Sequence, residues 1–274
     1  MYSDFFGLRT QPFTLYADPQ AFFASEVHGQ ARKKLLDCLK YQSGIVLVLG
    51  KVGTGKTTLC AHVKNQLGQN FLVASQNNPL LSTDSWLGEI NADFGYFTFS
   101  TNNCMLELKK NLYSSLRENK KPVLFIDEGH LLCNELLEQI LILSNLQEQT
   151  SPYLSIIISA LPELEQRLKE PAFSALQQRI KCRIFLQGLS FTDTLSYIEH
   201  RLVLAGSRGI ETFQPQAVRV IWKKSFGIPR LINHICAKAL EQAALKKNPR
   251  ISRLLVRKSL KDQDIAGLFS FKRT

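Results

Sequence analysis

The stretch that decides the fold is Ile45-Val46-Leu47-Val48-Leu49 followed by Gly50-Lys51-Val52-Gly53-Thr54-Gly55-Lys56-Thr57. Five consecutive apolar residues, three of them β-branched, predict a strand buried on both faces. The next eight residues fit G-x-x-x-x-G-K-[ST] at every position, and a helical pattern over 57–67 follows. A glycine-rich turn between a buried strand and a helix is typical of phosphate binding. We therefore expect an α/β fold built around a phosphate loop.

Each residue type in this loop has a chemical task. Glycines let successive backbone N–H groups turn inward around the β- and γ-phosphates of a nucleotide, and the helix N-terminus adds its positive dipole end. Lys56, expected as a surface charge at the loop–helix junction, supplies a cation, and the Thr57 hydroxyl ligates Mg²⁺. ATP and Mg²⁺ are thus the expected cofactors. The predicted nucleotide-binding residues in the loop are Gly50, Lys51, Val52, Gly53, Thr54, Gly55, Lys56, Thr57 and Thr58.

A second polar site follows another apolar run, Val123-Leu124-Phe125-Ile126-Asp127-Glu128. The strand delivers Asp127 to the carboxyl edge of the sheet, beside the loop, where we expect it to hold the metal through water. Glu128 is then placed to polarise a water that attacks the γ-phosphate in line. Acidic residues at a strand end also occur as solvated turn residues, but the phosphate loop favours the catalytic interpretation. Hydrolysis, as opposed to binding alone, rests mainly on Glu128.

Strand and helix patterns alternate over residues 40–187, which predicts a parallel sheet sandwiched by helices. From about residue 190 the pattern is only helical, with helices capped or opened at Thr192, Pro215, Pro229 and Ser252. The expected strands are 45–49, 71–75, 123–126 (bounded by Pro122), 155–160 and 180–186, and the expected helices before them or between them are 28–41, 57–67, 105–118 and 134–147. The predicted domains are 1–27, an extended N-terminal linker; 28–188, the nucleotide-binding domain; 189–262, a small all-helical lid; and 263–274, a basic tail.

Composition excludes several classes of protein. The 274 residues are 45% apolar, which excludes general disorder. No apolar run approaches the roughly 20 residues that span a bilayer, and residues 1–9 carry no signal-peptide pattern. We therefore expect no transmembrane segment and a cytoplasmic protein, peripheral at the inner membrane if it docks there. The six cysteines are scattered singly, which predicts free and mostly buried thiols.

Basic residues are concentrated toward the C-terminus. The chain has 34 Lys and Arg against 23 Asp and Glu, a formal net charge of +11. Residues 246–274 contain nine of the basic residues and only two acidic ones. Three interpretations stay open at this point: the solvated face of the last helix and a solvated end, docking on the anionic cytoplasmic leaflet or on a partner, and contact with DNA phosphates.

Together these motifs resemble AAA+ ATPases. The finer resemblance is to the ExeA-like ATPases, which include the general secretion pathway protein A group and the shorter MshM-type proteins of mannose-sensitive pilus biogenesis. It covers about residues 1–262, and this chain is nearer in length to the MshM type. The same group is similar to transposition ATPases of the TnsC and MuB kind. The resemblance is carried by Phe5-Phe6-Gly7-Leu8, Pro12-Phe13, Asp18-Pro19, residues 53–60, Asn78-Pro79-Leu80-Leu81-Ser82, Leu143-Ser144-Asn145-Leu146, Pro162-Glu163-Leu164, Gln178-Arg179-Ile180 and residues 227–233.

The resemblance implies roles for three more residues. Ser159 ends the strand next to the acidic one and would sense the γ-phosphate, or else be a strand-end hydroxyl bonded to backbone. Arg179 follows the helix before the last strand, where this class places a finger that reaches a neighbouring subunit's nucleotide; Arg167 and Arg183 are the alternatives. Arg230 opens a lid helix, where a cation opposes the helix dipole unless a phosphate is its partner. These roles imply a ring-shaped or helical homo-oligomer.

The resemblance also implies a biological role. An ATPase of this kind would hydrolyse ATP within an oligomer and drive assembly of an MSHA-like type IV pilus or a type II secretion machine, with an envelope-machine protein as its partner. The alternative is a DNA-binding ATPase that regulates transposition target selection. Three positions depart from the family pattern: Lys51 stands where Glu is usual, Gly129-His130 where Ala-Gln is usual, and Ala160-Leu161 where Gly-Gln is usual. The first two border the catalytic site and predict slow or partner-dependent turnover.

Overall fold

In the computed structural model, the described residues are 2–16, 18–41, 44–77, 82–96, 104–148, 151–207 and 212–260. They form two compact units. The sheet unit comprises Gly29–Val52 and Lys56–Leu186, and the helical unit comprises Met1–His28, Gly53–Gly55 and Gln187–Thr274. The middle of the phosphate loop thus clusters with the helical unit, although its two ends belong to the sheet unit.

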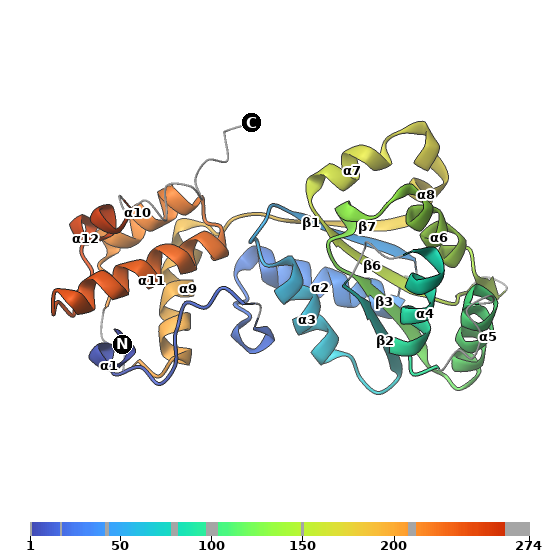
Figure 1. The fold of residues 1–274 in the computed structure, drawn as a ribbon, viewed down its shortest axis with the longest axis horizontal. Coiled ribbons are helices and arrows are strands. Elements are labelled where there is room, and N and C mark those ends of the chain that lie inside the picture. Colours follow the sequence, from blue (N-terminus) through green and yellow to red (C-terminus); the bar gives the residue numbers. More distant parts are fainter. Residues whose placement is uncertain are drawn as a thin grey trace. The chain divides into compact units, whose positions relative to one another are not determined.

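Five parallel strands form the centre of the sheet unit (Figure 1). In spatial order they are β2 (Phe71–Gln76), β3 (Lys121–Ile126), β6 (Ser155–Ala160), β1 (Ile45–Gly50) and β7 (Ile180–Leu186). Every residue of β1 and β6 is buried, as their continuous apolar runs predicted. The parallel α/β sheet expected from the sequence is therefore confirmed.

Helices cover both faces of this sheet. Figure 1 shows α2 (Glu26–Tyr41) and α3 (Lys56–Gln66) on one side, and α4 (Thr83–Asp93), α5 (Cys104–Arg117) and α6 (Asn134–Ser144) on the other. Alternate residues of β1 pack on the face covered by α4, α5 and α6, because successive side chains of a strand point to opposite faces of the sheet. The core cluster on that face includes Ile45, Leu47, Leu49, Leu108, Leu124 and Ile140. Two further helices, α7 (Pro162–Leu168) and α8 (Ser174–Arg179), and the short strands β4 (Gln147–Glu148) and β5 (Ser151–Pro152) complete the unit.

Four helices form most of the helical unit: α9 (Phe191–Leu204), α10 (Pro215–Ser225), α11 (Pro229–Leu245) and α12 (Arg253–Ser259). Pro215 and Pro229 stand at the first positions of their helices, where a missing N–H costs nothing. The Ser252 hydroxyl caps α12 by accepting a hydrogen bond from the backbone N–H of Leu255 at 3.4 Å. These helix starts agree with the sequence, and the apolar faces meet in a second core that includes Ile198, Ile221, Ile232, Leu240 and Val256.

The N-terminal segment is more ordered than the extended chain that its composition predicted. Residues Tyr2–Phe6 form a helix, α1, and Pro19–Ala21 form a 3-10 turn. Phe13 is buried in the core of the helical unit, with its ring 6.1 Å from that of Phe213. Phe13 therefore contributes to a core, whereas Tyr16 is exposed.

Buried polar side chains attach the same segment to the helices. The Arg201 guanidinium donates to the Pro12 carbonyl at 2.6 Å and to the Thr14 hydroxyl at 3.1 Å. The Asn233 amide donates to the Thr14 carbonyl at 2.9 Å and accepts a hydrogen bond from the Tyr197 hydroxyl at 2.7 Å. Since buried polar groups must be paired, these bonds give the segment one defined path across α9 and α11.

Two predicted helix boundaries are wrong. The cap of α9 is Ser190 and not Thr192: the Ser190 hydroxyl accepts a hydrogen bond from the backbone N–H of Asp193 at 3.0 Å. The helix expected over 134–147 ends at Ser144, because the chain then turns toward β4. At the start of α9, Ser190 and Thr192 are both residue types that favour the N-cap position, so local sequence did not distinguish them.

Two further features of the sheet unit differ from expectation. Pro122 lies inside β3 and does not bound it. This is tolerated because pairing with β6 begins only at Val123, so the proline precedes the segment that is paired on both sides. Helix α4 was not predicted, although its buried residues Trp86, Leu87 and Ile90 stand at the i, i+3 and i, i+4 spacing of a helical face.

All six cysteines are free, and all except Cys133 are buried, as predicted. Within the part of the chain that the structure describes, no helix combines the length and the apolar character needed to cross a bilayer.

Candidate nucleotide-binding site

The Asp127 carboxylate is the centre of a set of polar contacts at the carboxyl edge of the sheet. The register pairs Ile126 of β3 with Ile158 of β6. The residues that follow these two, Asp127 and Ser159, therefore lie side by side at the carboxyl edge of the sheet. The Ser159 hydroxyl donates to Oδ1 of Asp127, and the Thr57 hydroxyl donates to Oδ2 at 2.8 Å. Three residues that the sequence selected from three distant segments are thus brought together. The partner of Ser159 is a carboxylate and not the backbone group that the alternative interpretation required.

This donor set fits Mg²⁺. The ion prefers hard oxygen ligands, and proteins usually supply one or two carboxylates while water and substrate phosphates complete its shell. Thr57 is exposed and offers a hydroxyl oxygen beside the Asp127 carboxylate. Among the described residues, no group of three or more His, Cys, Asp and Glu side chains is arranged to hold a metal ion. The arrangement therefore suits a metal that a nucleotide helps to bind, and not a cage made by protein side chains alone.

Glu128 has an unusual backbone conformation directly after the strand. Its φ of 51° and ψ of 37° lie in the left-handed region, which costs a non-glycine residue about 1 to 3 kcal/mol and is often found at functional sites. The side chain is 51% exposed, with Oε2 at 3.5 Å from Nδ1 of His130. The carboxylate therefore stays accessible to solvent beside the buried strand end, as a group that positions water requires.

Gly129 explains one departure from the family pattern. A Cβ atom added there would overlap Cγ2 of Ile158 and would lie 3.4 Å from the Ser159 carbonyl oxygen. Ile158 is a fully packed core residue of β6. The alanine that the resemblance leads us to expect at this position therefore has no room here, and glycine is required by the close approach of the chain to β6.

The expectation that Lys56 is a surface charge is wrong. Its side chain is only 7% exposed, and Nζ donates to the Gly50 carbonyl at 2.8 Å and to the Lys51 carbonyl at 3.3 Å. Burial lowers the pKa of Lys56, while the nearby Glu128 and Asp127 carboxylates act in the opposite direction. The loop winds around its own lysine, because consecutive carbonyls in the turn point inward to meet the ammonium group.

Gly53 of the loop contacts the start of α11 within the helical unit. Its φ is +78°, and an added Cβ would lie 2.5 Å from Cβ of Arg230, so only glycine fits. The backbone N–H of Arg230 donates to the Gly53 carbonyl at 3.2 Å, and the Arg230 side chain is exposed. The first turn of α11 is therefore tied to the loop by its backbone, which leaves the guanidinium available for another partner.

The other loop residues differ in exposure. Lys51 and Val52 are exposed, Thr54 is buried, and Thr58 is partly buried. Gly50 ends β1, opposite Leu186 of β7. Their contacts with nucleotide stay predictions, as do those of the whole set that the sequence selected.

Sequence reasoning missed His28, which contacts the same loop. This histidine, 5% exposed, places Nε2 at 2.8 Å from the Thr54 carbonyl oxygen and Nδ1 at 2.8 Å from the Ser25 hydroxyl. Burial lowers the pKa of His28, while the Thr54 carbonyl and Asp193 act in the opposite direction. No local sequence pattern predicts the contact between His28 and Thr54, because a histidine at the start of a helix occurs in many different environments.

The three candidate finger arginines differ in their contacts. Arg167 donates to the Leu132 carbonyl at 2.6 Å and lies over the Phe173 ring at 5.6 Å. Arg183 forms an ion pair with Glu165 at 3.3 Å. Arg179, the last residue of α8, is exposed, and within the described part of the chain its guanidinium has no hydrogen-bond or ion-pair partner.

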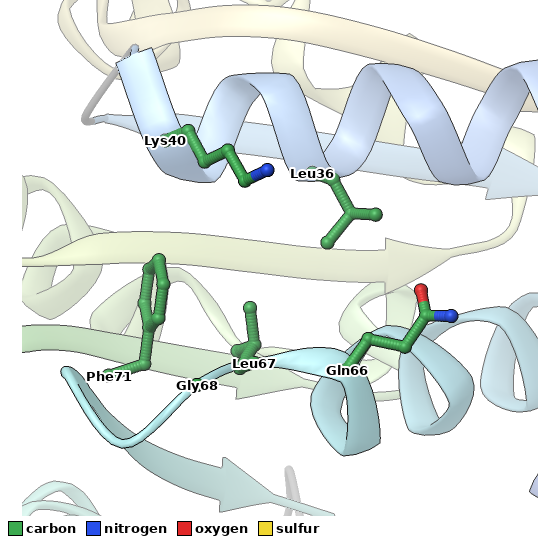
Figure 2. A pocket seen from close by; sticks show the side chains of 6 residues that line it. All are labelled: Leu36, Lys40, Gln66, Leu67, Gly68 and Phe71. Carbon is green, nitrogen blue, oxygen red and sulfur yellow. The ribbon is translucent and has the colours of Figure 1, made fainter.

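A hollow elsewhere on the sheet unit takes no part in this site. Figure 2 shows Leu36 and Lys40 projecting from α2 toward Leu67 and Phe71. These residues come from the C-terminal ends of α2 and α3 and from the start of β2. Because the strands are parallel, the hollow lies at the amino edge of the sheet, opposite the edge where Asp127 emerges.

Comparison with known proteins agrees with this geometry. Residues 39–168 match a family described as AAA domain. General secretion pathway protein A of Aeromonas hydrophila is 35% identical over 254 residues, which is 92% of this chain and 46% of that protein. The chain carries an AAA ATPase domain related to general secretion pathway protein A. It spans about half the length of that relative.

Other AAA proteins share the fold at lower identity. The Holliday junction branch migration complex subunit RuvB of Fusobacterium nucleatum is 24% identical over 236 residues, 82% of this chain and 60% of that protein. A Drosophila ORC structure bound to DNA superposes with a TM-score of 0.71 at 21% identity, covering 93% of this chain and 65% of the other. RuvB of Thermotoga maritima gives a TM-score of 0.56 at 19% identity, with 92% and 73% covered. These likenesses confirm the AAA fold, with a helical region after the sheet.

The packing of Gly129 leads to a stability prediction for this AAA domain. Gly129→Ala forces a methyl group against Ile158, and overpacking of this kind costs about 1 to 3 kcal/mol. We expect a lower midpoint of thermal unfolding, measured by circular dichroism on the purified protein.

Gly88→Ala is the matched control. Gly88 lies inside α4, and the nearest atom to an added Cβ is the Cys104 sulfur at 4.0 Å. The same change there should raise stability by about 0.5 to 1 kcal/mol, because alanine restricts the unfolded chain more than glycine does. Equal midpoints for Gly129→Ala and the wild type would contradict the steric account of position 129.

Proposed function

We propose that this protein binds ATP and Mg²⁺ at the phosphate loop and hydrolyses ATP within a homo-oligomer. Its role would be to drive assembly of an envelope machine, either an MSHA-like type IV pilus or a type II secretion apparatus. The observation that carries the hydrolytic part is the meeting of Thr57, Ser159 and Asp127 at one sheet edge, next to an exposed Glu128. The 35% identity to general secretion pathway protein A supports the envelope role.

In the proposed site the loop binds the phosphates, and Thr57 together with the strand end at Asp127 would hold the metal ion. Backbone N–H groups of the loop and the Lys56 ammonium bind the β- and γ-phosphates, in place of the loop carbonyls that Lys56 contacts in this structure. Thr57 and Asp127 would hold Mg²⁺, which supplies charge neutralisation at the phosphate oxygens when bound. Ser159 orients the Asp127 carboxylate through its hydrogen bond.

Glu128 acts on the attacking water. Its carboxylate accepts a hydrogen bond from the water and aligns it with the γ-phosphorus. It takes the proton of the water as the new P–O bond forms and the bond from the γ-phosphorus to the β–γ bridging oxygen breaks, so that ADP leaves. Arg230 is expected to contact a phosphate, since its backbone is tied to Gly53 while its side chain stays exposed. Arg179 is the finger that we assign to a neighbouring subunit's nucleotide, because Arg167 and Arg183 already have partners in their own chain.

The charge of the helical unit favours a polyanionic partner. Residues 212–260 contain eleven Lys and Arg and a single acidic residue, Glu241, so they hold a net +10 of the chain's +11. Ten of the eleven basic side chains are exposed. The predicted tail, 263–274, lies outside the described residues, but the charge does not depend on it. Anionic lipid at the inner membrane is the partner that fits the envelope role, with the protein on the cytoplasmic side.

The same charge favours the alternative function, a DNA-binding ATPase that regulates transposition target selection. A non-specific filament on DNA needs phosphate contacts and no sequence-reading module. Among the relatives, the Drosophila ORC structure is bound to DNA, and RuvB is named for branch migration at Holliday junctions. These are properties of those two proteins.

Two substitutions separate binding from hydrolysis. Lys56→Met keeps the buried methylene stem and removes the cation, so ATP affinity should fall at least tenfold, or by about 1.4 kcal/mol or more. Glu128→Gln should keep ATP affinity within about threefold and lower phosphate release by about 10² to 10⁴, because an amide cannot take the proton. Calorimetric titration and a phosphate-release assay measure the two quantities. Lys109→Met, an exposed lysine of α5, is the control, and normal turnover by Glu128→Gln would show that another group positions the water.

The finger assignment predicts complementation between subunits. Arg179→Ala should bind ATP as the wild type does and lose hydrolysis, since such fingers are worth about 10³ to 10⁵ in rate. Mixing it with Lys56→Met subunits should restore part of the activity, because one partner keeps an intact loop and the other keeps the guanidinium. If mixtures that demonstrably co-assemble show no gain, Arg179 does not act in trans, and Arg167 or Arg183 takes its place as candidate.

The two biological roles differ in the polyanion that stimulates ATP hydrolysis. We expect vesicles containing about 30% phosphatidylglycerol to bind the protein and raise its turnover, while vesicles of phosphatidylcholine do not. Double-stranded DNA at equal phosphate concentration is the second arm of the assay. Stimulation by DNA together with an ordered filament in electron micrographs, without an effect of vesicles, would instead support the transposition role.

A further inference from the structure

His28 is a buried polar residue beside the phosphate loop that the proposed mechanism does not use. It lies in the first turn of α2, with 5% of its surface exposed, and its ring meets the Phe22 ring edge at a centroid distance of 6.4 Å. The ring spans from Ser25 on one side to Thr54 on the other, each at 2.8 Å. His28, Ser25 and Thr54 all belong to the helical unit, so the contact lies within one compact body.

The partners determine which ring nitrogen carries the proton. The Thr54 oxygen is a backbone carbonyl and can only accept, so Nε2 of His28 donates to it. Since burial favours the neutral ring, Nδ1 is an acceptor, and the Ser25 hydroxyl donates to it. The Ser25 oxygen in turn accepts a hydrogen bond from the backbone N–H of His28 at 3.3 Å. The ring is thus held at both nitrogens in one tautomer and one orientation.

The geometry of the peptide unit carries this orientation into the loop. The C=O of Thr54 and the N–H of Gly55 belong to one planar trans peptide, and they point in opposite directions. The Thr54 carbonyl faces His28, so the Gly55 N–H points away from His28. A side chain at Gly55 would meet the ring, because an added Cβ would lie 3.3 Å from Nε2. If the Thr54–Gly55 peptide rotated, the Thr54 carbonyl would turn from His28 toward the interior of the loop, where the Gly55 N–H now points.

We propose that His28 is a positioning residue for phosphate binding. By holding the Thr54 carbonyl outward, it keeps the Gly55 N–H turned toward the interior of the loop, where it donates to a nucleotide phosphate. Without this bond the Thr54–Gly55 peptide is free to turn, and an inward carbonyl oxygen repels phosphate. This inference rests on the proposed binding of ATP at the loop, and it concerns how the loop is preorganised for that binding.

The test uses two amide substitutions that differ in where they place a donor. His28→Gln carries its amide nitrogen about where Nε2 of the imidazole lies, so it can still donate to Thr54. His28→Asn reaches only about as far as Nδ1 and cannot. Both variants lose the ring and its contact with Phe22, so both lose similar packing. We expect His28→Asn to raise the dissociation constant for ATP at least tenfold and His28→Gln to stay within about threefold of the wild type, measured by titration of the full chain with Mg²⁺ and ATP.

His200→Asn is the matched control. His200 is a partly buried histidine of α9 whose ring lies 5.4 Å from the Phe23 ring in the same unit, and no contact joins it to the described loop residues. His200→Asn should lower the midpoint of thermal unfolding, because it removes a packed imidazole ring, and it should leave ATP affinity unchanged. A drop in affinity equal to that of His28→Asn would show that general loosening of the helical unit explains the result, and would overturn the proposal.

The remaining outcomes are also decisive. Equal affinities for His28→Gln and His28→Asn, whether both normal or both reduced, would assign His28 a packing role only. If His28→Asn does not fold, Ser25→Ala takes its place: it removes the donor to Nδ1, and we expect a two- to fivefold weaker affinity, with an unchanged affinity overturning the proposal. Failure of the wild type itself to bind ATP would instead refute the proposed function, and this inference with it.

Discussion

The parallel register between β3 and β6 is the constraint on which the site depends. Because Ile126 is paired with Ile158, Asp127 and Ser159 emerge together, and a shift of one residue would send one of them to the opposite face. The register itself is held by burial, since β6 is buried over its full length and β3 is buried from Pro122 on. A hydrophobic constraint in the sheet thus sets the geometry of the polar contacts at its edge.

Close packing near this edge leaves little freedom to the residues that follow. Glu128 adopts a left-handed backbone, and Gly129 passes so near Ile158 that a methyl group does not fit. At position 129, where the resemblance leads us to expect alanine, glycine therefore fits the close approach to the isoleucine of β6. The Glu128 carboxylate that precedes this glycine stays exposed to solvent.

Charge is distributed very unevenly over the molecule. The sheet edge gathers Asp127 and Glu128 around one buried lysine, whereas residues 212–260 carry nearly the whole net positive charge of the chain. The arginines of the sheet unit also differ in their contacts. Arg167 and Arg183 bind the Leu132 carbonyl and the Glu165 carboxylate of their own chain, and Arg179 is exposed to solvent. Of these three arginines, Arg179 alone has no hydrogen-bond or ion-pair partner among the described residues.

Local patterns in the amino-acid sequence, namely apolar runs, glycine spacing and a helix start, were enough to predict the parallel α/β sheet, the phosphate loop and the acidic strand end. The burial of Lys56 among loop carbonyls and the hydrogen bond from Ser159 to Asp127 became apparent only in the folded chain. The same holds for His28, which lies beside Thr54, 26 residues away in sequence. Such contacts join segments whose separation in the chain says nothing of their distance in space, and packing, which has no local signature, brings them together.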